Sequence, residues 1–153
     1  AFLDHGAGGS GELLAALLRP GNAGSNTAAD HIEVTRQALA ALPGINPSRP
    51  GRKVLIRTDG GGASREFLTF LTKQGVTYSI GWTLPWVEMG EIYEAVTTAE
   101  GWSPALATGD EVNEKADVAE ITDLLTHRGH LKGWPADRAT PDFGVASPST
   151  RPV

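Results

Sequence analysis

A carboxylate followed by three glycines is the feature of this sequence best suited to chemistry. The run from Lys53 to Thr58 is apolar at its centre, as a buried central strand requires, and it ends at Asp59. Gly60–Gly62 let the chain turn sharply, and Ser64 can cap a helix immediately afterwards. A carboxylate at the C-terminal edge of a sheet, beside a helix N-terminus, is well placed to bind a cation. We therefore predict that Asp59 is a divalent-metal ligand.

Two other interpretations of this segment stay open. An aspartate before glycines commonly serves only to form a turn. Gly60–Gly62 could instead cradle a phosphate at the N-terminus of the next helix. The segment lacks the lysine of a Walker motif and the spacing of a dinucleotide fingerprint, so a tight turn is the favoured interpretation. Asp59 alone cannot build a two-metal site, which needs ligands from other segments.

Two further groups of residues have types that could bind a ligand. Asp4 and His5 follow the first apolar run, and they could approach Asp59 if the two strands are neighbours. Solvation at a turn is the alternative for this pair. His127 and His130 have a spacing that metal ligands use, but the sequence offers no evident third ligand.

The remaining candidates carry weaker predictions. Arg57 either contacts a phosphate or is a plain surface charge. The four tryptophans are expected to belong to the core or to a lid rather than to stack on bases: Trp82, Trp86, Trp102 and Trp134.

A strand–helix–strand unit over residues 53–80 is expected to position Asp59. A helix from Ser64 to Gln74 follows the glycines and stops at Gly75, and a strand then runs from Val76 to Ile80. Such a crossover normally joins parallel strands.

The segment before this unit predicts a hairpin and a helix. Strands over residues 1–4 and 12–18 flank a glycine-rich turn, with a short helix over residues 13–18 as the alternative. Thr27 and Asp30 have the spacing of a capping box, which places a helix over residues 28–42.

After residue 80 we expect a helix from Pro85 to Thr98 and a strand near residues 102–106. A polar turn over residues 109–117 and a strand over residues 118–122 should follow. Residues 136–153 contain prolines without periodicity and are predicted to form a disordered tail.

The composition is that of an ordinary globular domain. The chain has 153 residues, of which 40% are hydrophobic and 20% charged, so it can bury a core as one domain. Its net charge of −5 argues against nonspecific binding of nucleic acid through a broad basic field. There are no cysteines, which excludes disulfides and thiolate metal sites. We expect no membrane span and a cytoplasmic location.

Three segments together resemble bacterial insertion-sequence transposases of the DDE type, and more narrowly the group-one transposase DDE domain. They are the run Leu3–Gly6, the asparagine-containing loop Leu18–His31 and the strand-to-turn segment Val54–Gly62. The resemblance covers roughly residues 1–135. It implies an α/β fold with a ribonuclease H-like mixed sheet and flanking helices, incomplete here, with a core over residues 1–82. Residues 83–135 would hold part of an insertion that follows the second catalytic carboxylate.

The resemblance also implies a chemistry. In this family three carboxylates hold two Mg²⁺ (or Mn²⁺) ions, which activate water or a 3′-hydroxyl for attack on DNA. Asp59 matches the second carboxylate, as a catalytic residue and metal ligand. The first carboxylate is expected before Ala1 and the third beyond this chain. The implied partners are DNA, both transposon ends and target, and an intact transposase as homo-oligomer.

The sequence departs from the family pattern after Gly133-Trp134-Pro135. A basic strand is expected there, but the chain continues with Ala136-Asp137 and a tail rich in proline and serine. We therefore expect a transposase fragment that is inactive alone. The alternatives are a small α/β phosphate- or nucleotide-binding module and a non-catalytic regulator of an intact transposase.

Overall fold

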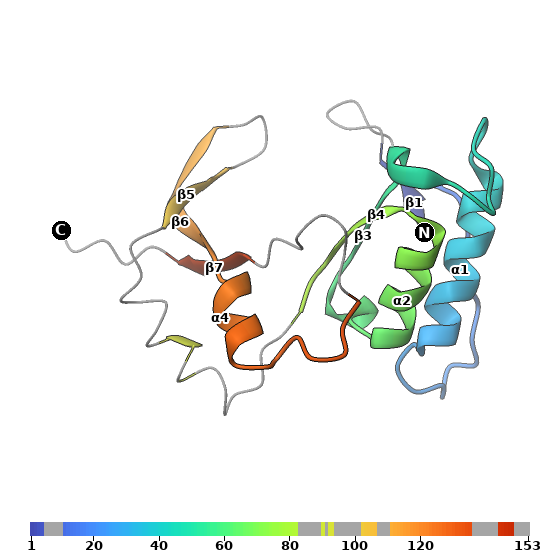
Figure 1. Cartoon of the computed structure of the whole chain (residues 1–153). Coiled ribbons are helices and arrows are strands. Elements are labelled where there is room, and N and C mark those ends of the chain that lie inside the picture. Colours follow the sequence, from blue (N-terminus) through green and yellow to red (C-terminus); the bar gives the residue numbers. More distant parts are fainter. Residues whose placement is uncertain are drawn as a thin grey trace. The chain divides into compact units, whose positions relative to one another are not determined.

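The computed structural model describes residues 1–4, 11–82, 90, 92–93, 102–106 and 111–135, and the backbone of residues 144–148. The chain divides into two compact units, residues 1–83 and residues 84–153. Helices and strands occur in both (Figure 1), which confirms the predicted α/β class. The predicted boundaries between the core and the insertion, after residue 82, and between the insertion and the tail, after residue 135, stay predictions.

The first unit begins with a short hairpin. Strand β1 (Phe2–Leu3) pairs antiparallel with β2 (Glu12–Leu13), so the predicted hairpin is confirmed, although each strand has only two residues. Residues 14–20 form neither a helix nor a strand, which removes the alternative of a short helix. The glycine-rich turn itself lies mostly outside the described residues.

Helix α1 (Ala28–Ala41) starts where the capping box predicts. The Thr27 hydroxyl accepts a hydrogen bond from the Asp30 N–H, and the Asp30 carboxylate accepts one from the Thr27 N–H at 2.7 Å. These two bonds satisfy donors that the first turn of a helix otherwise leaves unpaired.

The strand–helix–strand unit is confirmed. Strand β3 (Leu55–Thr58) pairs in parallel with β4 (Thr77–Ile80), and helix α2 (Arg65–Gln74) connects them. The Ser64 hydroxyl caps α2 by accepting from the Phe67 N–H. Gly75 ends the helix with φ at +70°, a left-handed conformation that favours glycine.

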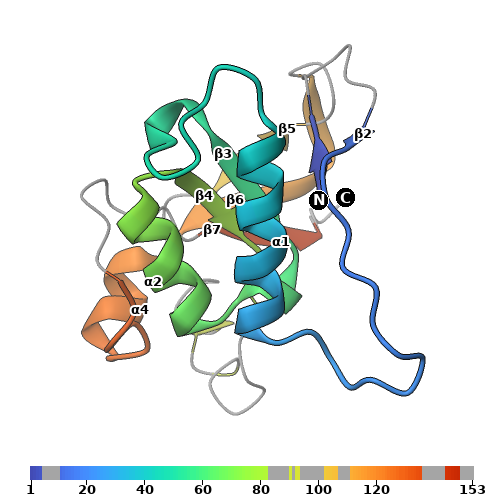
Figure 2. The same cartoon turned by 90° about the vertical axis from the view of Figure 1, so that its right-hand side faces the viewer.

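The core of this unit is formed mainly by α1 and α2. Helices α1 and α2 lie side by side in both views (Figures 1 and 2). The buried apolar side chains come mainly from these two helices and include Leu39, Phe67, Leu68 and Leu71. The His31 ring of α1 lies 5.4 Å from the Phe67 ring of α2, between ring centroids.

The prediction of a buried central strand from Lys53 was wrong. Residues Gly51–Lys53 form a 3₁₀ turn, η1, so β3 begins only at Leu55. The Leu55 side chain is 56% exposed. Exposure alternates along β3, with Leu55 and Arg57 exposed and Ile56 and Thr58 half-buried, so one face of the strand is covered and the other is not.

The second unit contains an antiparallel sheet in the order β5-β6-β7. Its elements are β5 (Ser103–Leu106), β6 (Val112–Glu120), helix α4 (Thr122–His127) and β7 (Gly144–Pro148). The strand predicted near residues 102–106 is confirmed. The polar turn predicted over residues 109–117 was wrong from Val112 on, because an antiparallel strand tolerates polar side chains on an open face. The strand predicted over residues 118–122 corresponds to the last part of β6, which ends at Glu120, and α4 follows.

Two predictions about this unit are tested only in part. Gly90, Ile92 and Tyr93 are helical, and the other residues of the helix predicted over 85–98 lie outside the described residues. Residues 144–148, predicted as part of a disordered tail, instead form β7 along β6, where the backbone of a long strand offers hydrogen-bonding partners. In the part of the chain that the structure describes, no helix has the length and apolar character needed to cross a membrane.

Candidate active-site groove

Asp59 lies immediately beyond the C-terminal end of β3, as predicted. It is exposed, and its backbone is extended (φ −77°, ψ −170°) where the chain enters the 3₁₀ turn η2 (Gly60–Gly62). The Asp59 Oδ1 atom accepts a hydrogen bond from the Gly61 N–H at 3.0 Å. This bond fixes the direction of the carboxylate. Among the described residues nothing else pairs with the Asp59 carboxylate, so its Oδ2 atom is available to a ligand.

The glycine turn is shaped by close packing around Thr58. A Cβ atom at Gly62 would lie 2.8 Å from the Thr58 Cβ, closer than real carbon atoms approach. At Gly81, directly after β4, a Cβ would lie 3.1 Å from the Gly60 nitrogen and 3.2 Å from the Asp59 carbonyl carbon. The Gly81 N–H also donates to the Thr58 carbonyl at 3.0 Å. The two glycines therefore allow the ends of β3 and β4 to meet beside Asp59.

The backbone N–H groups of the glycine turn donate hydrogen bonds within the turn itself. The Gly62 N–H donates to the Asp59 carbonyl, the Ala63 N–H to the Gly60 carbonyl and the Ser64 N–H to the Gly62 carbonyl. With the Gly61 N–H held by the Asp59 side chain, these four amides already have acceptors. A phosphate cradle needs free N–H groups, so this arrangement favours a tight turn.

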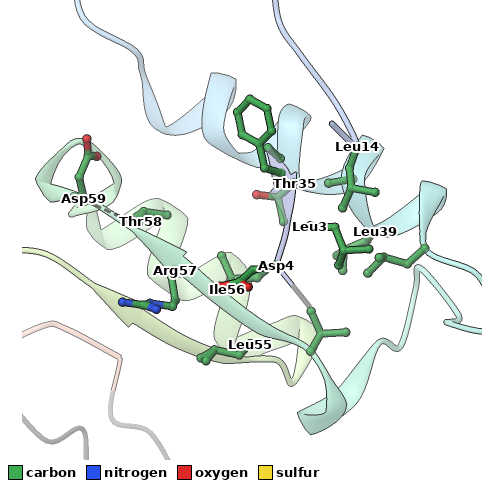
Figure 3. A pocket seen from close by; sticks show the side chains of 15 residues that line it. Leu3, Asp4, Leu14, Thr35, Leu39, Leu55, Ile56, Arg57, Thr58 and Asp59 are labelled. Carbon is green, nitrogen blue, oxygen red and sulfur yellow. Dashed lines mark hydrogen bonds between the residues drawn. The ribbon is translucent and has the colours of Figure 1, made fainter. Parts of the chain in front are cut away.

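Asp59 lies at one end of an open groove of about 700 Å³ in the first unit. Residues of β1, α1 and β3 line the groove (Figure 3). Asp4 lines it too, so the structure brings the two predicted aspartates to one groove. Figure 3 shows them apart, with Asp59 beyond the end of β3. Strands β1 and β3 belong to separate sheets and do not pair.

Of the other candidates, Arg57 lines the same groove as Asp59; it is exposed on β3 and forms no ion pair with Asp59. His127 ends α4 in the second unit, and His130 lies in the turn after it. Within the described ranges no three His, Cys, Asp or Glu side chains gather as a metal site would require. His5 lies outside those ranges. Three of the tryptophans are half-buried, which favours packing roles, and Trp86 lies outside the described residues.

The asparagine-containing loop is held by Arg19, a role that sequence reasoning missed. The Arg19 Nη1 atom donates to the Gly24 carbonyl at 2.9 Å and to Asn26 Oδ1 at 3.0 Å. It also lies 3.6 Å from Asp30 Oδ2. The hydrogen bond from the Thr27 N–H is the main cause that lowers the pKa of the Asp30 carboxyl, and the charge of Arg19 adds to it. The opposite charges of Arg19 and Asp30, on either side of a loop that contains two glycines, were the signal in the sequence that could have predicted this contact.

Comparison with known proteins gives a family match. The family model for the transposase DDE domain, group 1, matches residues 2–98, which include β1 to β4 and Asp59. No curated protein and no solved structure matches the chain. The family match covers more than half of the sequence. The chain therefore belongs to the group 1 transposase DDE domain family, whose function is DNA transposition.

Proposed function

We propose that Asp59 is a catalytic carboxylate of this DDE domain and a ligand for Mg²⁺ or Mn²⁺. The observation that carries the proposal is its position within the matched region, exposed beyond the end of β3. The Gly61 N–H orients one carboxylate oxygen and leaves the other available. Carboxylate oxygens are the ligands that these hard cations prefer.

The donor set near Asp59 fits part of a metal site. One aspartate is present, and the described residues supply no cluster of three ligands. The remaining ligands would be water molecules, DNA phosphates or carboxylates outside the described residues. When bound, the metal would activate water or a 3′-hydroxyl for attack on a DNA phosphodiester. The residues of this chain would hold one side of the ion and orient the carboxylate. We propose that the chain alone does not cleave DNA.

We further propose that residues 1–82 are part of a ribonuclease H-like core and that residues 83–135 belong to an insertion. Support comes from the parallel β3–β4 pair with its connecting helix α2, in which β3 ends at the proposed metal ligand. The antiparallel strands of the second unit are compatible with an inserted segment. The phosphate-binding alternative has less support, because the amides of the glycine turn already donate within it.

Localised oxidative cleavage tests the metal site. Fe²⁺ replaces Mg²⁺ at oxygen-ligated sites, and with ascorbate and peroxide it cuts the polypeptide beside the bound ion. The proposal expects a cut near residues 59–61 that Mg²⁺ suppresses. Asp59→Asn should abolish the cut, and Asp123→Asn, at an exposed aspartate of α4, should retain it. Equal cutting in both variants would refute the assignment.

A second experiment tests DNA as the partner. Fluorescence anisotropy of a labelled DNA duplex is measured with and without Mg²⁺ at several salt concentrations. We expect weak binding that Mg²⁺ strengthens, because the net charge of −5 opposes DNA unless a cation bridges the phosphates. Asp59→Asn should remove the Mg²⁺ effect. Binding that Mg²⁺ leaves unchanged would contradict a bridging metal at Asp59.

A further inference from the structure

The groove beside Asp59 is bordered by the edge of β3 that faces away from β4. The Val54 carbonyl accepts from the Thr77 N–H at 3.0 Å, and the Thr58 carbonyl accepts from the Gly81 N–H at 3.0 Å. Successive residues of a strand direct their backbone groups to opposite edges. The backbone N–H and C=O groups of Leu55 and Arg57 therefore point away from β4.

Strand β1 presents a similar edge. The Ala1 nitrogen donates to the Ala15 carbonyl, and the Ala1 carbonyl accepts from the Leu14 N–H, both on the side of β2. By the same alternation Leu3 also faces β2, and the backbone groups of Phe2 face the opposite way. Residues 1–4 line the groove, so this second edge borders it too.

Apolar side chains form the floor between the two edges. Ala38 and Leu39 of α1 are buried there, and Leu14 and Leu42 complete the floor. Figure 3 shows Leu3, Leu14 and Leu39 gathered at the end away from Asp59. Leu55 and Phe2 on the two edges remain 56% and 70% exposed. An apolar floor between two hydrogen-bonding edges has the chemistry of a site from which one strand is missing.

We propose that this groove binds an extended polypeptide strand whose alternate side chains are apolar. Its backbone would pair with Leu55 and Arg57 on one side and with Phe2 on the other, and its apolar side chains would cover the floor. Strand β3 has four residues, which span about 13 Å at 3.3 Å per residue, so a segment of similar length fits. The groove suits such a strand better than it suits the phosphate backbone of DNA, because its floor is apolar and its charged side chains are Asp4, Asp59 and a single cation, Arg57. This inference does not depend on metal binding at Asp59.

Proline at position 55 provides a selective test. Leu55→Pro removes a donor that faces the groove and leaves the β3–β4 hydrogen bonds in place. The preceding residue, Val54, has φ −104° and ψ 122°, which suits a residue before proline. Leu55→Ala is the matched control, because it shortens the same side chain but keeps the N–H.

The probe is a soluble peptide of about seven residues that alternates valine and lysine, long enough to span β3. Its binding is followed by amide hydrogen exchange and by fluorescence anisotropy. We expect the peptide to protect the Leu55 and Arg57 amides. Leu55→Pro should weaken binding by about three- to tenfold, the effect of one lost hydrogen bond, beyond any change in Leu55→Ala. Protection of the α2 amides checks that the variant is folded.

A peptide N-methylated at every second residue keeps the side chains but loses backbone donors, and it requires no change to the protein. We expect it to bind much more weakly. Equal binding of the methylated peptide, or no protection at Leu55 and Arg57, would overturn the proposal. Protection of these amides in the chain alone that rises with protein concentration would also overturn it, because a second copy would then fill the groove.

Discussion

Replacing Gly62 by alanine should destabilise the first unit, because the new Cβ would collide with Thr58. The added methyl carbon would lie 2.8 Å from the Thr58 Cβ and 3.1 Å from its Cγ2. The collision with the Thr58 Cβ cannot be relieved by rotating the side chain, since that atom is fixed to the backbone of β3. Overpacking of this kind costs about 1–3 kcal/mol. The strain falls on the residue that precedes Asp59.

Urea unfolding measures this cost. With a slope of about 2 kcal/mol per molar urea, a loss of about 2 kcal/mol lowers the midpoint by about 1 M. Hydrogen exchange of the α2 amides assigns the loss to the first unit. Gly21→Ala is the control, because a Cβ there meets no atom within 4 Å. That substitution should change the midpoint little.

A double-mutant cycle tests the named collision. Thr58→Gly removes every Thr58 atom that the alanine would meet. In that background Gly62→Ala should cost at least about 1 kcal/mol less than in the wild-type chain. If Gly62→Ala unfolds at the same urea concentration as Gly21→Ala, the account of the turn is refuted.

Three further predictions concern the helices that support the groove. Leu71→Ala should cost about 2–5 kcal/mol in urea unfolding because this side chain is 0% exposed, whereas Phe70→Ala, at a half-buried site, should cost less. Thr27→Ala should cost about 1 kcal/mol and speed exchange at the start of α1, and Ser25→Ala should do neither. The lowered pKa of Asp30 contributes stability that is present above its unfolded-state pKa and lost as the pH falls through the folded-state pKa. Asp30→Asn should flatten that part of the stability profile, and an NMR titration that gives Asp30 an ordinary or raised pKa would contradict this.

The local signals in the sequence were sufficient for the elements that carry Asp59. Thr27 and Ser64 cap α1 and α2 through side-chain hydrogen bonds to residues three positions away, and Gly75 ends α2 with a positive φ. Each of these effects operates within a few residues, so spacing alone predicts them. The position of Asp59 after β3 followed from the same reasoning.

Features that depend on distant partners could not be predicted in this way. Leu55 is exposed because its side of β3 is left uncovered, and the residue types within β3 do not encode which of its two faces is covered. Gly81 contacts the Asp59 turn only because β3 and β4 are parallel and end together. Strand β6 contains Glu114 and Lys115, whose polarity is typical of a loop, and its strand pairing with β5 and β7 decides its structure.

The most direct test of the central claim is Mn²⁺ titration followed by NMR. A paramagnetic ion broadens the signals of nuclei close to it, and Asp59 is proposed to hold the ion beside Gly60 and Gly61. The account predicts that the amide signals of these glycines broaden at Mn²⁺ concentrations that leave α4 unaffected, that Asp59→Asn removes the effect, and that Asp123→Asn preserves it. Undiminished broadening of these glycines in Asp59→Asn would contradict the assignment of Asp59 as a metal ligand.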